Sequence, residues 1–178
     1  MKIFDSHCHL DDKRYRKDIA RVIERAHQNS VTRMMTVGVN KKTAERAVEL
    51  AESHPGIYAS LGFHPHDASQ CGADELDFLT ELAQNPRVKA WGEIGLDYNR
   101  MYSPRQDQER WFIRQLKIAA ELNFPSFSMN ATPMDVFLRF SKPISKTKAP
   151  VSFIVSAARH RNWNIILIWV CTSELPVS

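Results

Sequence analysis

Long apolar runs are missing from this sequence of 178 residues. No stretch reaches the length of about 18 apolar residues that a membrane-spanning helix needs. At the N-terminus only Ile3 and Phe4 separate Lys2 from Asp5, so the apolar segment of a secretory signal peptide is missing as well. We therefore expect neither a transmembrane helix nor a signal peptide. Both absences favour a cytoplasmic location and no membrane partner.

Cysteine is scarce. The chain has three cysteines, Cys8, Cys71 and Cys171, and their spacing does not match any common metal-binding pattern. An odd number of widely separated cysteines is typical of free thiols in a reducing compartment. Cysteine usage therefore also favours the cytoplasm.

Glycine is absent after Gly95, because all six glycines lie at or before that position. The charge also changes along the chain. Residues 1–125 carry 18 basic and 18 acidic side chains, whereas residues 126–178 carry six basic and two acidic ones, and hence the whole net charge of +4. Tight turns are difficult to build without glycine. We therefore place a boundary after residue 125 and expect residues 126–178 to form a weakly ordered tail.

What residues 1–125 do contain is a regular alternation of strand-like and helix-like patterns. β-Rich stretches occur at residues 2–5, 31–37, 57–62 and 88–96, and helical periodicity occurs at residues 15–28, 41–53, 74–84 and 104–122. Strands that alternate with single helices form a parallel sheet. A barrel of eight such units takes about 250 residues, so we predict an α/β fold, a partial TIM-type barrel of about four β-α units. Ser103 is expected to cap the last helix, with Pro104 in its first turn.

Two histidines, His7 and His9, follow the first predicted strand. Side chains two residues apart on a strand point to the same face, about 7 Å apart, and two imidazoles placed in this way can bind one metal ion. The alternative is a pair of ordinary polar residues in a loop, which for an isolated His-x-His is equally good. Cys8, between them, is expected to point away and to be a packed free thiol.

Titratable residues also follow the third and fourth predicted strands, and the strand ends of such a barrel meet at one rim, where catalytic side chains lie. Glu93 is a carboxylate in an otherwise apolar strand, between Gly92 and Gly95. On a central strand it would be buried and would need a cation or hydrogen bonds. On an edge strand it would be an ordinary surface residue. With His7 and His9 at the same rim, we favour a metal bridge.

Two further histidines, His64 and His66, follow the third predicted strand on either side of a proline. His64 is our candidate substrate-binding residue, while a second metal ligand and a plain loop histidine remain open as alternatives. His66 is interpreted as an ordinary loop histidine. Asp97, at the end of the fourth predicted strand, is expected either to support a metal ligand from behind or to begin a turn.

Three stretches together resemble the N-terminal signatures of a known family, the TatD family of metal-dependent deoxyribonucleases. They are Asp5–Asp11, Gly62–Pro65 and Gly92–Tyr98, and they occur in the family's order and at fitting spacing. The resemblance covers residues 1–125. It implies an eight-stranded TIM-type barrel with one or two divalent metal ions (Mg, Mn or Zn), bound in the manner of the amidohydrolases.

The resemblance also implies an activity and a set of metal ligands. The activity is phosphodiester hydrolysis in DNA, of the 3'-5' exonuclease type, with DNA as the partner and no obligate protein partner. His7 and His9 would hold one metal ion, and Glu93 would bridge to a second. Two metal ions about 3.5–4 Å apart can generate a hydroxide and neutralise the charge that develops on the phosphate.

The chain departs from the family pattern after Pro125. The strand endings His-x-Arg and His-Cys-Phe-Ser/Thr-Gly that the resemblance leads us to expect are absent in this reading frame. In a shifted reading frame, each codon consists of the last base of one present codon and the first two bases of the next. In that frame the codon that spans Met129 and Asn130 must encode Glu, and the codons around it allow the sequence His-Glu-Arg-Asp-Ala. The shifted codon that spans Phe153 and Ile154 must encode His or Tyr, and the four shifted codons after it allow Cys-Phe-Ser-Gly. Our hypothesis is that residues 126–178 are translated out of frame.

This hypothesis has a functional consequence, because a catalytic zinc site normally has three protein ligands and a two-metal site needs more. We expect a TatD-type hydrolase that is truncated and either impaired or inactive. One alternative is a non-catalytic half barrel that binds nucleic acid through a basic tail. Another is a small-molecule hydrolase of the amidohydrolase type, since loops decide the choice of substrate.

Overall fold

The computed structural model describes residues 2–133, 135–136, 139, 153–159 and 162–168. The strands are β1 (Ile3–Cys8), β2 (Val31–Gly38), β3 (Ile57–Leu61), β4 (Val88–Asp97), β5 (Ser126–Ala131), β6 (Phe153–Arg159) and β7 (Asn162–Ile168). The α-helices are α1 (Ile19–Gln28), α2 (Lys41–Ser53), α3 (Ala73–Leu82) and α4 (Arg105–Glu121), and two 3₁₀ helices are η1 (Lys13–Tyr15) and η2 (Pro65–Gln70).

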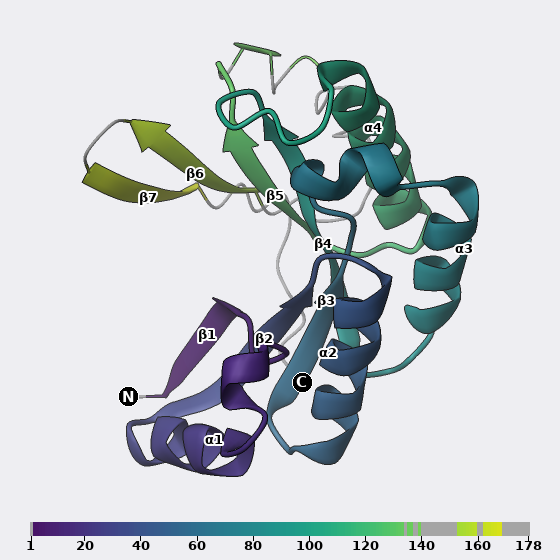
Figure 1. Cartoon of the computed structure of the whole chain (residues 1–178). Coiled ribbons are helices and arrows are strands. Elements are labelled where there is room, and N and C mark those ends of the chain that lie inside the picture. The colour runs from purple at the N-terminus through teal and green to yellow at the C-terminus, as the bar shows by residue number, and fades with distance from the viewer. Residues whose placement is uncertain (1, 134, 137–138, 140–152, 160–161, 169–178) are drawn as a thin grey trace.

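The first five strands form one parallel sheet in the order in which they occur in the chain, β1-β2-β3-β4-β5. Neighbouring strands are joined by single helices, which lie on one side of the curled sheet (Figure 1). The predicted partial barrel with four β-α units is therefore confirmed. No strand is predicted directly after residue 125, yet β5 continues the sheet through residues 126–131 and pairs with β4.

The helices form where an apolar stripe faces the sheet. On α2, for example, the buried residues Ala44, Ala47, Val48 and Ala51 recur at helical spacing. Asn40 begins this helix with a capping box: its side chain accepts a hydrogen bond from the N–H of Thr43, whose hydroxyl in turn accepts one from the N–H of Asn40.

The main core lies between the sheet and the helices. Its largest fully buried side chains include Trp91 of β4 and Phe112 of α4. A smaller apolar cluster contains Met35, Ala90 and Phe127, from strands β2, β4 and β5. Because all five strands of the sheet are parallel, the carboxyl ends of β1, β3 and β4 lie at one rim.

The start of α4 differs from the prediction. Its N-cap residue is Pro104, and no side chain caps the helix. The buried hydroxyl of Ser103 instead donates to the carbonyl oxygen of His66 (2.7 Å) and accepts from the N–H of Ser69 (3.0 Å). The prediction that Ser103 is the cap is wrong, because this hydroxyl ties the loop before α4 to η2.

After β5 the structure describes only parts of the chain. Strands β6 and β7 pair in antiparallel fashion, and Figure 1 shows this hairpin beside β5. The expected weak order of the tail concerns residues that lie mostly outside the described ones. Within the described residues, no helix combines the length and the apolar character required to cross a bilayer.

Candidate metal centre at the rim of the sheet

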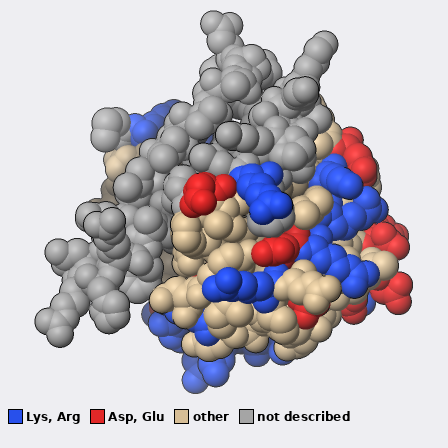
Figure 2. All heavy atoms as spheres, turned by 90° about the horizontal axis from the view of Figure 1, so that it is seen from above, with Lys and Arg blue, Asp and Glu red and all other residues tan. Residues whose placement is uncertain are grey.

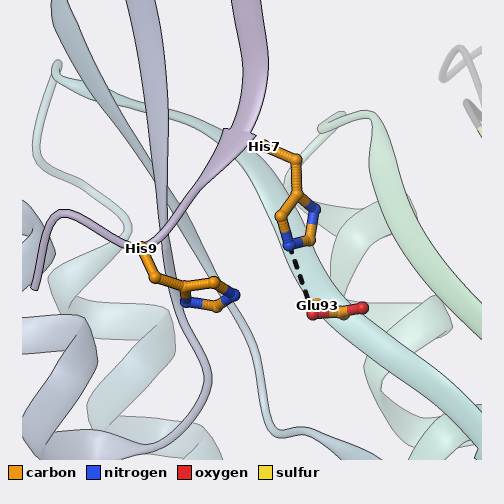
Figure 3. A group of neighbouring side chains, drawn as sticks. All are labelled: His7, His9 and Glu93. Carbon is orange, nitrogen blue, oxygen red and sulfur yellow. Dashed lines mark ion pairs between the residues drawn. The ribbon is translucent and has the colours of Figure 1, made fainter. Parts of the chain in front are cut away.

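Three residues that the sequence singled out, His7, His9 and Glu93, come together at the rim. Each offers one nitrogen or oxygen atom, and these atoms all lie within 4.8 Å of one another. Nε2 of His7 lies 3.5 Å from Oε2 of Glu93, and Figure 3 shows both histidines on the chain segment that faces β4. The side chains of His7 and Glu93 are 29% and 17% exposed, so the cluster opens to solvent.

A β-bulge in β4 directs Glu93 to this cluster. Trp91 pairs with Ser126 and Ile94 with Ser128, so β4 advances three residues while β5 advances two. The extra residue changes the alternation, so that Trp91 and Ile94 are both in the core although they are three positions apart. Glu93, between them, is left with its carboxylate partly exposed.

Two glycines make this bulge possible. Gly92 has a φ of 152° and Gly95 a φ of 136°, backbone conformations that residues with a side chain rarely adopt. A Cβ atom on Gly92 would meet the backbone of Phe127, and one on Gly95 would meet the carbonyl oxygen of Met129. The glycines around Glu93 therefore let β5 pack closely against the strand that carries the carboxylate.

A second bulge lies in β1 at His7. Asp5 pairs with Met34 and Cys8 with Thr36, so β1 also advances three residues where its neighbour advances two. The thiol of Cys8 points away from the cluster and donates to the carbonyl oxygen of Met35 at 3.2 Å. Burial raises its pKa to about 12. The prediction of a packed free thiol is confirmed.

The two histidines differ in their electrostatic surroundings. Burial lowers the pKa of His7, although the nearby carboxylate of Glu93 opposes this effect. The carboxylate of Asp11, whose Oδ1 lies 3.7 Å from Nδ1 of His9, raises the pKa of His9. A carboxylate behind one ring nitrogen is the usual support of a metal-binding histidine, because it leaves the other nitrogen free for the metal.

The donor set fits a divalent transition-metal ion or zinc. Two imidazoles and one carboxylate are the ligands of several catalytic zinc and iron sites, which keep further positions open. In a tetrahedral site with bonds of about 2.05 Å, two ligand atoms lie about 3.4 Å apart, close to the 3.5 Å between His7 and Glu93. The buried Oδ1 atom of Asp11 has no hydrogen-bond partner, as expected if His9 turns its Nδ1–H toward it when a metal binds.

His64 does not join this cluster. Its Nδ1 accepts a hydrogen bond from the N–H of His66 at 3.1 Å, and burial lowers its pKa to about 3.

The sequence favoured an ordinary loop histidine for His66, but its Nε2 lies 2.6 Å from Oδ2 of the buried Asp97. Asp97 also begins a turn, since its Oδ1 accepts the N–H groups of Asn99 and Arg100.

Two features of the site are not predicted from the sequence. Asp11 ends the first motif, and its position two residues after His9 is the only sequence signal for its contact with that histidine. The pair of His66 and Asp97 joins the ends of β3 and β4, and only the adjacency of these strands in the sheet brings the two side chains together.

The carboxylate of Asp97 leads to a prediction for stability. Burial raises the pKa of Asp97, but hydrogen bonds from Arg100, His66 and Asn99 outweigh burial and hold it below its usual value. A carboxyl group whose pKa is lower in the folded state stabilises the fold at every pH above its pKa in the unfolded state, which is about 3.9. This stabilisation is lost as the pH falls through the pKa of the folded state. We expect Asp97→Asn to lose about 2 kcal/mol at neutral pH.

Urea unfolding from neutral pH down to acid measures this effect. The difference between the parent protein and Asp97→Asn should begin to shrink once the pH falls below about 3.9, and it should vanish only below the lowered pKa of the folded state, where the carboxyl group is neutral in both states. A difference that stays constant across the whole range would contradict the assigned role of the charge.

Comparison with known proteins identifies the family of this chain. The family described as TatD related DNase matches residues 4–128, which is most of the chain. The chain belongs to this family. The match ends within β5, three residues beyond the boundary that the sequence predicted, and it includes all three members of the cluster.

Curated relatives are longer than this chain. The protein is 40% identical over 123 residues to the uncharacterized metal-dependent hydrolase YabD of Bacillus subtilis, a match that covers 69% of this chain and 48% of the relative. It is 37% identical over 141 residues to the 3'-5' ssDNA/RNA exonuclease TatD of Escherichia fergusonii, covering 79% and 54%. The chain thus spans about half the length of the curated relatives it matches.

A solved structure confirms the fold of this TatD family member. The TatD homologue YJJV of Escherichia coli K12 superposes with a TM-score of 0.74 at 26% identity, over 80% of this chain and 56% of that one. The five parallel strands and their helices therefore correspond to about half of a TatD barrel.

Proposed function

We propose that this protein holds a divalent metal ion in the cluster of His7, His9 and Glu93, and that the site belongs to a phosphodiesterase. The observation that supports this most directly is the convergence of two imidazoles and one carboxylate within 4.8 Å, from the end of β1, the residue after it and β4. It is supported further by relatives named as a metal-dependent hydrolase and as an exonuclease on single-stranded DNA and RNA.

The residues of the cluster have separate tasks. A bound metal ion would lower the pKa of a water molecule and polarise a phosphate oxygen. His7 and His9 provide neutral nitrogens, and Asp11 orients His9 from behind. Glu93 provides the negative charge and would bridge to a second ion if one were bound. His64 binds the substrate through its ring nitrogen.

The proposed substrate is a DNA strand, cleaved from its 3' end, with Mg, Mn or Zn as the metal. An anionic phosphodiester suits a site in which two neutral imidazoles and one carboxylate hold a divalent cation, because the net charge of the loaded site stays positive. We propose low activity for this chain, because three ligands serve one metal ion, whereas a two-metal centre needs more. Among the described residues, no other group of three such side chains was found.

The fifth strand carries two buried hydroxyl groups that lack partners. β5 places Ser126 and Ser128 in the interior, and the hydroxyl groups of both have no hydrogen-bond partner. Buried polar groups without partners are rare in natural interiors and cost about 1–3 kcal/mol each.

The other functions that the sequence left open have less support. The basic residues of a nucleic-acid-binding tail lie mostly outside the described residues. On the described part of the face in Figure 2, basic and acidic side chains are interspersed, whereas a nucleic-acid track needs a continuous basic stripe. No observation on the described residues favours a small-molecule substrate over a phosphodiester.

Calorimetric titration of the purified, metal-free protein with Zn²⁺ or Mn²⁺ tests the metal proposal. We expect one ion per chain, and we expect Glu93→Gln to weaken binding by more than about a hundredfold, since even the outer partners of ligands contribute 10–100-fold. Glu45→Gln, an exposed carboxylate on α2, is the matched control and should leave binding unchanged. Equal affinities in the parent protein and Glu93→Gln would overturn the proposal.

A further inference from the structure

The hydrogen bond to Nδ1 fixes the form of the His64 ring. The backbone N–H of His66 lies 3.1 Å from this nitrogen and can only donate, so Nδ1 must carry a lone pair. In a neutral imidazole the single ring proton then lies on Nε2. Burial lowers the pKa of His64 to about 3, so the neutral ring is the form present at ordinary pH.

This form excludes His64 as a metal ligand. A neutral imidazole binds a metal through its unprotonated nitrogen, and in His64 that nitrogen already accepts a hydrogen bond from the backbone. The group of candidate ligands within 4.8 Å accordingly contains His7, His9 and Glu93 but not His64. His64 therefore has one hydrogen-bond donor available for a bound molecule, Nε2–H.

The backbone of His66 is held from two sides. Its ring donates to Asp97 at 2.6 Å and packs edge-on against the rings of His64 and Tyr102, with centroids 4.2 and 4.7 Å away. Its carbonyl oxygen accepts the hydroxyl of Ser103 at 2.7 Å. These contacts fix the direction of the His66 N–H, and hence the tautomer and orientation of His64.

Asp97 anchors this arrangement to the same strand that carries Glu93. Its carboxylate is buried, and the N–H groups of Asn99 and Arg100 hold its other oxygen. His64 follows the carboxyl end of β3, which pairs with β4, so it lies at the same rim as Glu93. A fixed neutral donor beside a metal site suits an anionic oxygen of a bound molecule, because it binds the oxygen without competing for the metal.

We propose that Asp97 and His66 are positioning residues that present Nε2–H of His64 to a non-bridging phosphate oxygen of the substrate. The inference rests on the proposed function and extends it from the metal to the phosphate. It assigns to His64 the recognition of the anion alone, and it makes the pair of Asp97 and His66 responsible for the geometry of that contact.

Nuclear magnetic resonance of the ¹⁵N-labelled full chain tests the tautomer directly. Long-range correlations between ring protons and nitrogens should show His64 protonated at Nε2, before and after Zn²⁺ is added. Zn²⁺ should shift the ring signals of His7 and His9, and inorganic phosphate those of His64. A ring of His64 protonated at Nδ1, or one whose nitrogen binds Zn²⁺, overturns the proposal.

Two variants test the positioning role. Asp97→Asn removes the charge, and His66→Phe keeps the ring packing but removes the Nε2–H donor. Both should allow mixed tautomers of His64 and weaken phosphate binding by about tenfold, the lower end of what outer partners contribute. His27→Asn, an exposed histidine on α1, is the control and should change neither property.

The two proposals fail in different ways. If both folded variants retain a single tautomer of His64 and the phosphate affinity of the parent protein, the positioning role is wrong. If Zn²⁺ leaves the signals of His7 and His9 unchanged, the metal proposal is wrong, and the tautomer and phosphate measurements on metal-free protein still decide the role of His64.

Discussion

Gly95→Val should destabilise the protein strongly. The φ of Gly95 is 136°, and a Cβ atom there would overlap the carbonyl oxygen of Met129 on the neighbouring strand. Neither the side chain nor the backbone oxygen can move without breaking the pairing of β4 and β5. Strain and overlap together should cost more than about 4 kcal/mol, against a total of about 5–15 kcal/mol for a typical domain.

Circular dichroism and urea unfolding measure this effect, and another glycine offers the control. Gly72 is the N-cap residue of α3, has an ordinary extended backbone, and a Cβ atom there would meet only the flexible end of the Glu75 side chain. Gly72→Ser should therefore be neutral or slightly stabilising. A Gly95→Val protein as stable as the parent would show that the bulge around Glu93 is not held in the way described.

Insertion of a single base ahead of codon 126 should raise metal-dependent DNA hydrolysis by at least about a hundredfold. The shift returns His-Glu-Arg-Asp-Ala to the end of the fifth strand, which pairs with β4 beyond the bulge at Glu93. A histidine there adds a ligand on the far side of Glu93. A second metal ion stabilises the transition state by several kcal/mol, and each 1.36 kcal/mol corresponds to about tenfold in rate.

Release of nucleotides from a 3'-labelled single-stranded oligonucleotide, with and without chelator, measures the gain. The control is the same inserted base in a Glu93→Gln background, which should remain inactive because the bridging carboxylate is absent. Metal titration should in parallel rise from one ion per chain to two. If the nucleotide sequence in the shifted frame does not encode these motifs, the hypothesis of an altered frame is wrong.

The sequence was sufficient for the four β-α units and for naming the candidate ligands. The alternation of strand and helix patterns is local, because apolar spacing along each segment decides which face it buries. The bounds of α2, Lys41–Ser53, agree with the prediction for this reason. His7, His9 and Glu93 could be named because each follows or interrupts an apolar strand, and all parallel strands end at one rim.

Only the tertiary structure decided how these side chains meet. The bulges in β1 and β4 are properties of strand pairing, since they depend on the residues that stand opposite in β2 and β5. The contact of His66 with Asp97 joins residues 31 positions apart, and no periodicity within either segment encodes it. Local pattern thus determined what the strands carry, whereas pairing between strands determined where each carboxylate and imidazole points.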